Sequence, residues 1–389
     1  MCDVMTTTSG VSLPGLRLVP AVAHLLRDPY TLRFGVDGGR AVMIDIPVSG
    51  VAELLEPLDG SHGERSSTAA PGISGQDARN LVAALRAHGL LVPAAAVPPP
   101  DVRADSPAAA EAAAVAASLR TPGRPATPDA AAPGPRESAA DPRRRGPAET
   151  RTPPHNGDRP VEGPITAADV RRRRLAAKVV VTGRGRLAAP IALALARSGV
   201  GHVRPDLAGT VHWTEALDAL GPAAVATPRG PAVAAAIELA VPGTRTGPCR
   251  PQLVVQAGAD RPATVTAAGA ARRRQAILMV EIRDGCPIIG PLVAPRASPC
   301  LDCLDRHRAD RDPAWPDIAA QLATTRVEEH CDHATLLTAA AFAAAEALAY
   351  IDGHEPQTAG GAVEITAPGR LRRRRWPPHP LCGCSRTRR

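Results

Sequence analysis

A buried strand that leads straight into a glycine-rich turn and a helix narrows the possible folds of this chain more than any other segment. The strand is Lys178-Val179-Val180-Val181, the turn runs from Gly183 to Ala188, and the helix extends through residues 191–197. A second strand then ends at Asp206. A Gly-x-Gly-x-x-Ala turn between a strand and a helix, with an acidic residue about 20 positions later, is the fingerprint of dinucleotide-binding domains. The sequence therefore predicts a Rossmann-like α/β core with a mainly parallel sheet.

The glycine-rich turn is also a candidate cofactor site. Gly183 and Gly185 allow a tight turn and the close approach of a phosphate, and the helix N-terminus that follows favours an anion. Asp206 stands where such domains hold a ribose. The same glycines suit a turn that persists for packing after nucleotide binding is lost, so the sequence leaves both interpretations open.

Three apolar runs predict further strands, at Ala223–Ala226, Gln252–Gln256 and Ala276–Ile282. Asp260 follows the second run, at the carboxyl end where parallel sheets bind ligands. Asp260 is therefore a candidate to hold Mg²⁺ or a ribose, and the alternative is that it caps the next helix.

Four cysteines form the most specific pattern in the sequence. Cys300 and Cys303 make a Cys-x-x-Cys turn, and Cys382 and Cys384 make a Cys-x-Cys pair with glycine between them. Together they supply four soft thiolate ligands at the spacing of a closed, tetrahedral zinc site. The rival is a redox Cys-x-x-Cys, which normally opens a helix in a thioredoxin-like fold that this sequence does not indicate. We therefore predict one structural zinc ion.

Other residues near this pattern carry weaker signals. Cys286 lies in an apolar, strand-like segment and is expected to be buried and inert. Cys331 has histidines close by on both sides, which leaves a second metal site or a nucleophile as alternatives to an ordinary helix start before Leu336–Ile351. His379 is placed to support the zinc loop without being a ligand.

Composition divides the chain into three parts. Residues 1–95 and 166–389 show periodic hydrophobic positions, whereas residues 96–165 are rich in Pro, Ala and Arg without them. Such a middle segment cannot bury enough apolar surface to offset its conformational entropy, so we predict a disordered linker. Aromatic residues make up only 2% of the chain, so both cores must be built from Val, Leu, Ile and Ala.

The first part reads as a small α+β module. An Asp-Gly-Gly turn joins two strand-like runs, Thr31–Val36 and Arg40–Ile46, into a predicted hairpin. Helices are expected over Val48–Leu58 and Gln76–His88, and Leu90–Val92 returns as a strand. This order suggests a winged-helix-like module. Its acidic and basic residues nearly cancel, so it lacks the basic face that DNA binding needs, and peptide or protein recognition by strand addition fits better.

Charge and hydropathy exclude two classes of partner. The net charge of +8 sits mainly in arginine runs such as Arg171–Arg174 and Arg372–Arg375, which we interpret as solvated boundaries of segments. Nucleic acid is not expected, because aromatic stacking partners and known binding motifs are lacking. A membrane is not expected either, because the start is not signal-like and no run approaches about 18 apolar residues. We expect a cytoplasmic protein.

In combination, these motifs resemble the ThiF family of ubiquitin-activating-enzyme-like adenylyltransferases. The resemblance covers roughly Ala168–Cys384. The motifs that carry it are Val179–Leu187, the strand into Asp206, Gln256–Asp260, Pro291–Val293 with Pro299–Cys303, and His379–Cys384. It implies a Rossmann-like core with a four-cysteine zinc site, ATP and Mg²⁺ as candidate ligands, and a homodimer. The module before it resembles the leader-peptide recognition domain of ThiF-like partners of YcaO cyclodehydratases, which implies a precursor peptide and a YcaO-like protein as partners.

The sequence departs from this family where ATP would be positioned. The family's Asn/Arg/Gln segment is not recognisable after Asp206, and no lysine follows Lys178. Arg184, Arg186 or Arg229 would have to stabilise the transferred group. We therefore expect a zinc protein that binds a leader peptide or protein partner in azole/azoline-type peptide modification, with adenylation lost or altered. The alternative is an ATP-dependent adenylyltransferase that activates a C-terminal carboxylate, as for ubiquitin-like modifiers, and no catalytic residue is identified for it.

Overall fold

The computed structural model describes two folded parts of the chain. The described residues are 16–19, 22–36, 41–46, 51, 52, 55, 58, 73–93, 165–258, 263–295, 299–324 and 329–384. The predicted linker, apart from residue 165, lies outside them, and so does Asp260. The domain boundaries therefore stay predictions.

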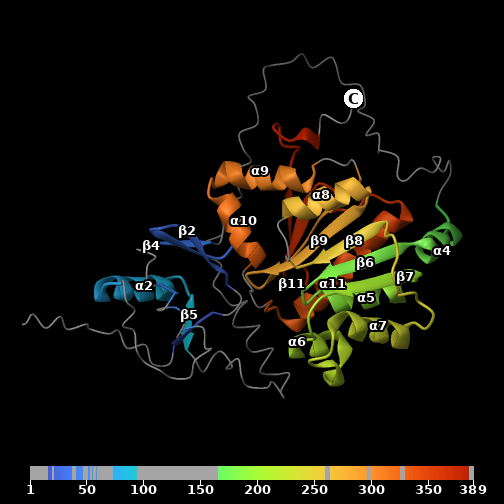
Figure 1. Ribbon diagram of the computed structural model, residues 1–389, viewed down its shortest axis with the longest axis horizontal. Coiled ribbons are helices and arrows are strands. Elements are labelled where there is room, and N and C mark those ends of the chain that lie inside the picture. Colours follow the sequence, from blue (N-terminus) through green and yellow to red (C-terminus); the bar gives the residue numbers. More distant parts are fainter. Residues whose placement is uncertain are drawn as a thin grey trace, which may run out of the picture.

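The larger part is built on a seven-stranded sheet in the order β12-β11-β10-β9-β8-β6-β7 (Figure 1). Its strands are β6 (Lys178–Gly183), β7 (His202–Leu207), β8 (Leu253–Ala257), β9 (Ala276–Arg283), β10 (Cys286–Val293), β11 (Gly361–Ala367) and β12 (Arg370–Arg375). The four strands from β7 to β9 are parallel, and β10, β11 and β12 extend them antiparallel. The predicted α/β fold with a parallel centre is therefore confirmed, and an antiparallel half is added to it.

Helices cover both faces of this sheet, with α8 and α9 on one face and α5, α7 and α11 on the other (Figure 1). The helices and helical turns of this part are α4 (Ala167–Ala176), α5 (Ala188–Arg197), α6 (Trp213–Glu215), η2 (Ala216–Leu220), η3 (Pro222–Ala224), α7 (Arg229–Ala240), α8 (Ala263–Arg273), α9 (Leu301–Arg311), α10 (Trp315–Thr324) and α11 (His333–Asp352). The result is a three-layer sandwich, the usual way to bury both faces of a parallel sheet.

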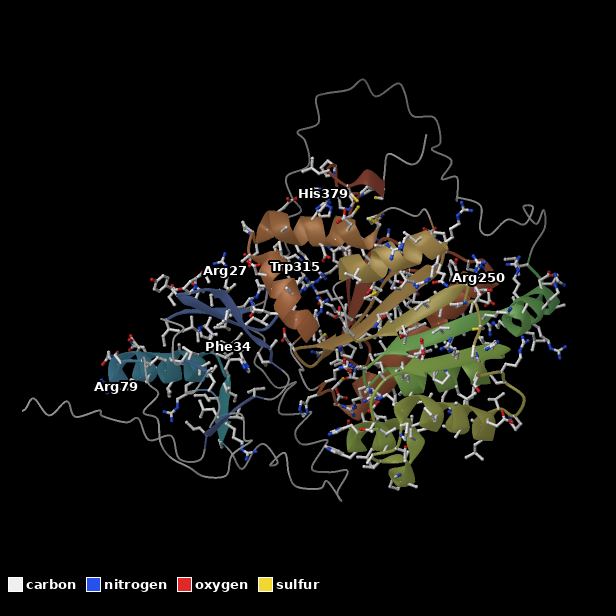
Figure 2. All side chains as sticks on the ribbon, in the orientation of Figure 1. Arg27, Phe34, Arg79, Arg250, Trp315 and His379 are labelled. Atoms are coloured by element: carbon white, nitrogen blue, oxygen red, sulfur yellow. The ribbon has the colours of Figure 1, made fainter. Side chains whose placement is uncertain are left out.

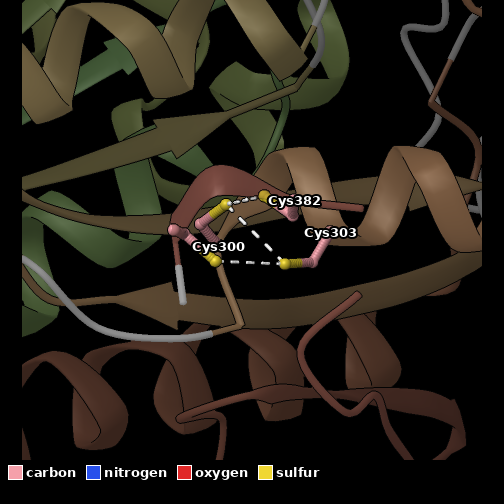
Figure 3. A group of neighbouring side chains, drawn as sticks. Cys300, Cys303 and Cys382 are labelled. Atoms are coloured by element: carbon pink, nitrogen blue, oxygen red, sulfur yellow. Dashed lines mark hydrogen bonds between the residues drawn. The ribbon is translucent and has the colours of Figure 1, made fainter. Parts of the chain in front are cut away.

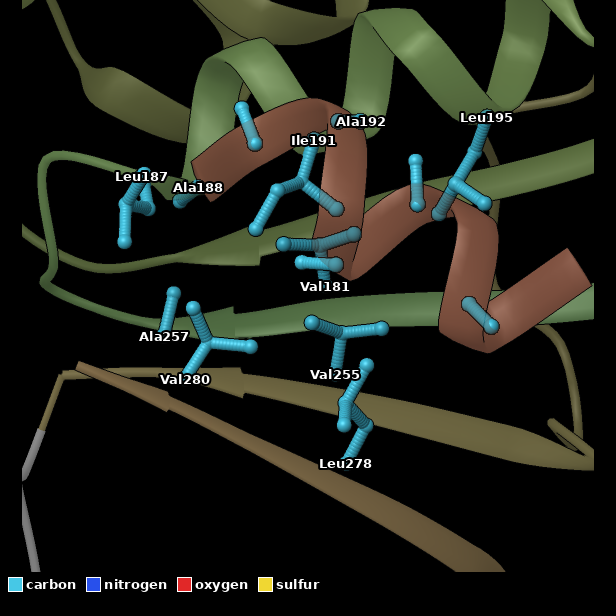
Figure 4. Close-up of a cluster of buried hydrophobic side chains, with 14 of the residues drawn as sticks. Val181, Leu187, Ala188, Ile191, Ala192, Leu195, Val255, Ala257, Leu278 and Val280 are labelled. Carbon is cyan, nitrogen blue, oxygen red and sulfur yellow. The ribbon is translucent and has the colours of Figure 1, made fainter. Parts of the chain in front are cut away.

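The main core lies between the sheet and helices α5 and α11 (Figure 4). Val181 and Val255 project from neighbouring parallel strands onto Ile191 and Leu195 of α5, and all four are fully buried. Small alanines on α5 and α11 let the helices approach the sheet closely. A core poor in aromatic residues therefore closes with aliphatic side chains alone, as its composition requires.

Helix α11 is the predicted alanine-rich helix. It begins at the N-cap Asp332, whose side chain accepts from the backbone N–H of Thr335, and ends at Gly353 in the left-handed conformation. It is the single helix among the described residues that is long and apolar enough to cross a membrane by length and composition, and 56% of its most apolar window is buried in the protein. Burial against the sheet accounts for its apolar character. A cytoplasmic location stays a prediction.

Two predictions about local structure were wrong. Residues 222–224 form the 3-10 turn η3 with Pro222 at its first position, instead of a strand at Ala223–Ala226. A short apolar run does not distinguish strand from helix by itself. The arginine run Arg372–Arg375 lies within strand β12, where Arg374 pairs with the buried Glu364 of β11 at 2.7 Å. It is part of the sheet and not a segment boundary.

The smaller, N-terminal part contains two small sheets. A three-stranded antiparallel sheet has the order β2 (His24–Asp28), β3 (Thr31–Phe34) and β4 (Val42–Asp45), and β1 (Leu16–Leu18) pairs with β5 (Leu91–Pro93). Helix α2 (Gly75–Ala87) is capped by Ser74. The predicted hairpin, the second helix and the returning strand are confirmed, whereas β1 and β2 were not predicted. Residues 51, 52, 55 and 58 of the first predicted helix are helical, and the winged-helix comparison stays a prediction.

This module packs directly on the larger part. Trp315 and Ile318 of α10 form a buried apolar cluster with Ala23, Leu25 and Val36 (Figure 2). The opposite face of the same sheet carries Leu32, Phe34 and Ile44 against Leu81 and Leu85 of α2. The N-terminal sheet is therefore sandwiched between its own helix and α10.

Polar contacts hold the same junction. Asp312, between α9 and α10, accepts from Arg33 at 2.9 Å and from Arg27 at 3.2 Å. The Arg33 side chain is only 4% exposed, and its guanidinium also donates to the carbonyl groups of Gly35 and Val36. The N–H of Val36 donates to Asp284 at 2.9 Å. The buried Arg33 of the N-terminal part therefore depends on Asp312 of the larger part for its counter-charge, and this ion pair holds the two parts together.

Candidate metal centre and glycine-rich turn

The four predicted zinc ligands come together in space. Cys300 and Cys303 lie at the start of α9, and Cys382 and Cys384 approach from the C-terminal loop (Figure 3). The Sγ–Sγ distances are 3.9 Å from Cys300 to Cys303, 3.6 Å from Cys300 to Cys382 and 3.3 Å from Cys303 to Cys384. The cysteines are therefore free thiols in a cluster and not disulfides.

These distances fit a tetrahedral zinc site. Four sulfurs at a Zn–S distance of about 2.3 Å stand about 3.8 Å from one another in a tetrahedron. Burial raises the pKa of Cys300 to about 11 and raises that of Cys382 further. The raised pKa means that a buried thiolate is costly to form by itself. A divalent cation that binds the four sulfurs offsets this cost, because its positive charge stabilises the thiolates. The residues fit a structural zinc ion, which would tie α9 to the C-terminal loop and supply no open position for chemistry.

His379 holds the loop that carries Cys382 and Cys384. Its Nδ1 accepts from the backbone N–H of Leu381 at 3.1 Å, and its Nε2 lies 2.8 Å from Asp310. Because Nδ1 is an acceptor, the ring proton belongs on Nε2 and is donated to Asp310. His379 therefore links α9 to the loop that carries Cys382 and Cys384, which agrees with the predicted supporting role.

A second group of possible ligands consists of His307, Asp310 and His379. The Nε2 atom of His307 lies 2.9 Å from the Pro377 carbonyl, so it too carries a proton. Both imidazoles therefore use their Nε2 protons within the protein, and Nδ1 of His379 is already engaged. This group is a hydrogen-bonded clamp between α9 and the C-terminal loop and not a metal site.

The two remaining candidate cysteines are buried. Cys286 lies in β10 with its Sγ 3.4 Å from the Ile365 carbonyl, and Cys331 is fully buried before α11. Burial raises the pKa of Cys331 beyond the range in which a thiolate forms near neutral pH. Neither residue has the environment of a nucleophile.

The glycines of the predicted cofactor site pack tightly against strand β8. A Cβ atom on Gly183 would lie 2.0 Å from the Ala257 carbonyl oxygen, and one on Gly185 would lie 2.8 Å from the Gly258 nitrogen. Gly183 also has a φ of +108°, which a larger residue rarely adopts. Packing therefore requires glycine at both positions, whether or not a nucleotide binds.

The three arginines predicted to stand in for a catalytic lysine differ in their surroundings. Arg186 makes a two-point ion pair with the fully buried Asp218, at 2.6 and 2.8 Å. Arg229 is paired with the buried Glu215 at 2.8 Å. Arg184 is exposed. Two of the three candidate cations are thus held by carboxylates of the chain itself.

The structure describes one of the two acidic candidates, Asp206. Asp206 is exposed at the end of β7, beside Thr182 in the sheet register, and pairs with Arg204 at 3.0 Å. Asp260 lies outside the described residues. The roles predicted for Gly183, Gly185, Asp206 and Asp260 toward ATP and Mg²⁺ stay predictions.

The sequence interpretation missed three polar residues that shape these regions. Asp310 follows His307 by one helical turn on α9, a spacing that the sequence displays and that could have been noticed. Gln321 and Glu329 contact segments roughly 300 and 143 positions away in the chain, and no local pattern announces such contacts.

No family model matches the sequence, and no curated protein matches it. Among solved structures, E. coli MccB is similar at 14% identity, with a TM-score of 0.47 over 95% of this chain and 96% of that one. E. coli MccB with MccA-N7isoASN gives 14% identity and a TM-score of 0.45 over 95% and 99%. PaaA gives 15% identity and a TM-score of 0.40 over 53% and 75%. All three TM-scores are below 0.5, so what this chain does must follow from its own residues.

Proposed function

We propose that this chain recognises an extended peptide along one edge of its N-terminal sheet, with the zinc-binding α/β core as the scaffold that holds the sheet. The carrying observation is that the two edges of the three-stranded sheet differ. One edge is filled by a side chain of the core, and the described residues leave the other without a partner.

The register of the hairpin determines which backbone groups point outward. The N–H of Ile46 donates to the Tyr30 carbonyl at 2.8 Å. Bonded and non-bonded pairs alternate along an antiparallel ladder, so Ile44 also faces β3. Met43 and Asp45 therefore direct their N–H and C=O groups away from β3, toward the outer edge of β4.

On β2 the same alternation shows that the outer edge is already occupied by a side chain of the core. The N–H of Gly35 donates to the Ala23 carbonyl at 2.7 Å, which places the N–H and C=O of Leu26 on the outer edge of β2. Leu26 donates to the side-chain oxygen of Gln321 at 2.9 Å, and the Gln321 amide donates back to the Leu26 carbonyl at 2.7 Å. The Gln321 amide thus makes the two hydrogen bonds that a neighbouring strand would make, and it occupies this edge of the sheet.

The edge of β4 suits an added strand. Unpaired strand edges bind extended peptides through main-chain hydrogen bonds, with alternate side chains giving specificity. Met43 is 41% exposed beside this edge and offers an adaptable apolar contact. The peptide we propose is the leader segment of a ribosomally made precursor, and the partner is a YcaO-like protein that forms azoles or azolines on it. A homodimer is part of the same proposal.

A support role in place of adenylation agrees with the charges of the core. The ion pairs of Arg186 and Arg229 leave those cations neutralised, and adenylyl transfer needs cationic stabilisation. We propose that the core contributes binding and structure, with its adenylation chemistry lost or altered.

Replacement of Met43 tests the binding edge in the full-length chain. Met43→Pro removes one outward N–H. The hydrogen bonds between β4 and β3 stay intact, because the N–H of Met43 points away from β3 and proline is tolerated at a strand edge. Met43→Ala keeps that N–H and is the matched control. With fluorescently labelled leader segments of ribosomally made precursor peptides, we expect Met43→Pro to weaken binding by about tenfold or more, and Met43→Ala by much less.

The outcome depends on the comparison of the two variants. Both must retain the wild-type metal content and melting temperature. Equal binding by Met43→Pro and the wild type would place the peptide elsewhere, and no binding of leader segments by the wild type would remove the proposal.

A further inference from the structure

Glu329 lies against the glycine-rich turn, at the point where the turn enters α5. Its carboxylate accepts from the backbone N–H of Arg186, two residues before the helix begins. A Cβ atom on Gly258, at the end of β8, would lie 3.2 Å from the same carboxylate. The carboxylate therefore stands over the carboxyl ends of the central parallel strands.

This is the position that an anion takes in a strand–turn–helix unit. N–H groups at the start of a helix lack intrahelical acceptors, and the helix dipole favours negative charge beside them. In a nucleotide-binding domain a phosphate accepts these hydrogen bonds. Here a carboxylate of the chain accepts from the N–H of Arg186, in the turn just before the N-cap Leu187.

The two N–H groups that precede Arg186 in the turn are also used within the chain. The N–H of Arg184 and the N–H of Gly185 both donate to the Ala257 carbonyl, at 3.0 and 2.9 Å. With Arg186 bound to Glu329, each of the three consecutive N–H groups from 184 to 186 has an acceptor supplied by the protein.

The charges around Glu329 oppose a second anion. The pKa of Glu329 is raised to about 7: burial is the largest cause and the carboxylates Glu281 and Glu215 act in the same direction, while Arg186 acts to lower it. The Arg186 guanidinium is itself neutralised by Asp218. A phosphate that entered here would meet these carboxylates, and the charge of the Arg186 cation beside it is already compensated.

We propose that the Glu329 side chain is a built-in occupant of the phosphate position of the glycine-rich turn, so that the core keeps the architecture of a nucleotide-binding domain in a self-occupied form. The occupant is a carboxylate, and the ligand class it excludes is the phosphate of a nucleotide. This inference is independent of peptide binding, because the edge of β4 belongs to the other part of the chain.

Removal of the carboxylate tests the proposal. Glu329→Ala frees the Arg186 N–H and leaves room for a small anion. Glu355→Ala, at an exposed glutamate after α11, is the matched control. Inorganic phosphate and Mg·ATP would be titrated by calorimetry into the full-length wild type and both variants. We expect Glu329→Ala to bind inorganic phosphate at least about tenfold more tightly than the wild type and the control.

Two results would overturn the inference. One is Mg·ATP binding by the wild type as tight as by Glu329→Ala. The other is a folded Glu329→Ala variant, with wild-type metal content, that gains no affinity for phosphate.

Hydrogen exchange provides a test that needs no variant. The Arg186 amide of the wild type should exchange slowly, and its rate should not change when Mg·ATP is added. Exchange at the rate of an unprotected amide, or protection that appears only with Mg·ATP, would contradict the occupied position and would leave the peptide proposal unaffected.

Discussion

Charged residues around the glycine-rich turn are arranged in compensated pairs. Asp218, which holds Arg186, has a fully buried side chain, and the Glu215 side chain that holds Arg229 is 3% exposed. Removing one partner of such a pair leaves a buried uncompensated charge, at a cost of about 3–5 kcal/mol. Arg186 and Arg229 therefore contribute to the stability of the fold, because each balances a buried carboxylate.

Glu329 gives the protein a titration near neutral pH. Its pKa is raised from 4.5 to about 7 in the folded chain, so the folded state holds this proton more firmly than the unfolded state. The contribution to stability is present below about pH 4.5 and is lost as the pH rises through about 7. Glu329→Gln has no proton to lose at this position, and its amide oxygen still accepts from Arg186.

We therefore expect the free energy of unfolding of the wild type to fall relative to that of Glu329→Gln between pH 5 and 8, by on the order of 2 kcal/mol. Urea unfolding of both proteins across this range measures the difference. Parallel curves for the two proteins would show that Glu329 titrates as an exposed carboxyl group does.

At the scale of elements, α9 connects the metal cluster to the domain junction. Its N-terminal turn carries Cys300 and Cys303, its last turn carries Asp310 of the clamp, and Asp312 follows its last residue. Thiolates at a helix N-terminus are favoured by the dipole. One short helix thus depends on the metal at its start and supports the N-terminal sheet at its end.

Replacing a ligand tests the zinc site. We expect about one zinc ion per wild-type chain, and its loss in Cys300→Ser together with a marked fall in stability, because four thiolates are needed to close the site. Elemental analysis and thermal unfolding measure the two effects. Cys249→Ser, at a free cysteine outside the cluster, should keep both metal and stability. A metal-free wild type with unchanged folding would contradict the zinc assignment.

At the scale of the whole molecule, the two folded parts share an interface with its own core. Trp315 and Ile318 bury apolar surface against the N-terminal sheet, and Arg33 is balanced by Asp312 across the junction. The long linker predicted between the parts would permit free movement, but the buried contacts define one arrangement.

Asp312→Ala removes the counter-charge of the buried Arg33. We expect a loss of about 3 kcal/mol in the free energy of unfolding, because the two carbonyl groups bound to Arg33 compensate its charge only in part. Asp317→Ala, at an exposed acidic residue on α10, should change stability by about 0.5 kcal/mol or less. Chemical unfolding measures both. Equal effects of the two variants would mean that the parts are not held by this pair.

Local sequence patterns were enough to predict the strand–turn–helix unit, the hairpin, the alanine-rich helix and the four members of the cysteine cluster. Each rests on local chemistry: glycine at positive φ, alternating apolar positions, a capped helix, and thiol spacing that a tetrahedral ion requires. These patterns lie within a few residues of one another, or in two short motifs with a shared ligand.

The contacts between these parts could not be predicted from the sequence and depend on how the chain folds in three dimensions. Whether Gly183 faces a phosphate or a neighbouring strand depends on Ala257, and whether the turn is open depends on Glu329. Which edge of the N-terminal sheet stays open depends on Gln321. Hydrogen bonds and ion pairs between distant segments form wherever folding brings donor and acceptor together. Local sequence patterns do not predict which distant residues will pair in this way.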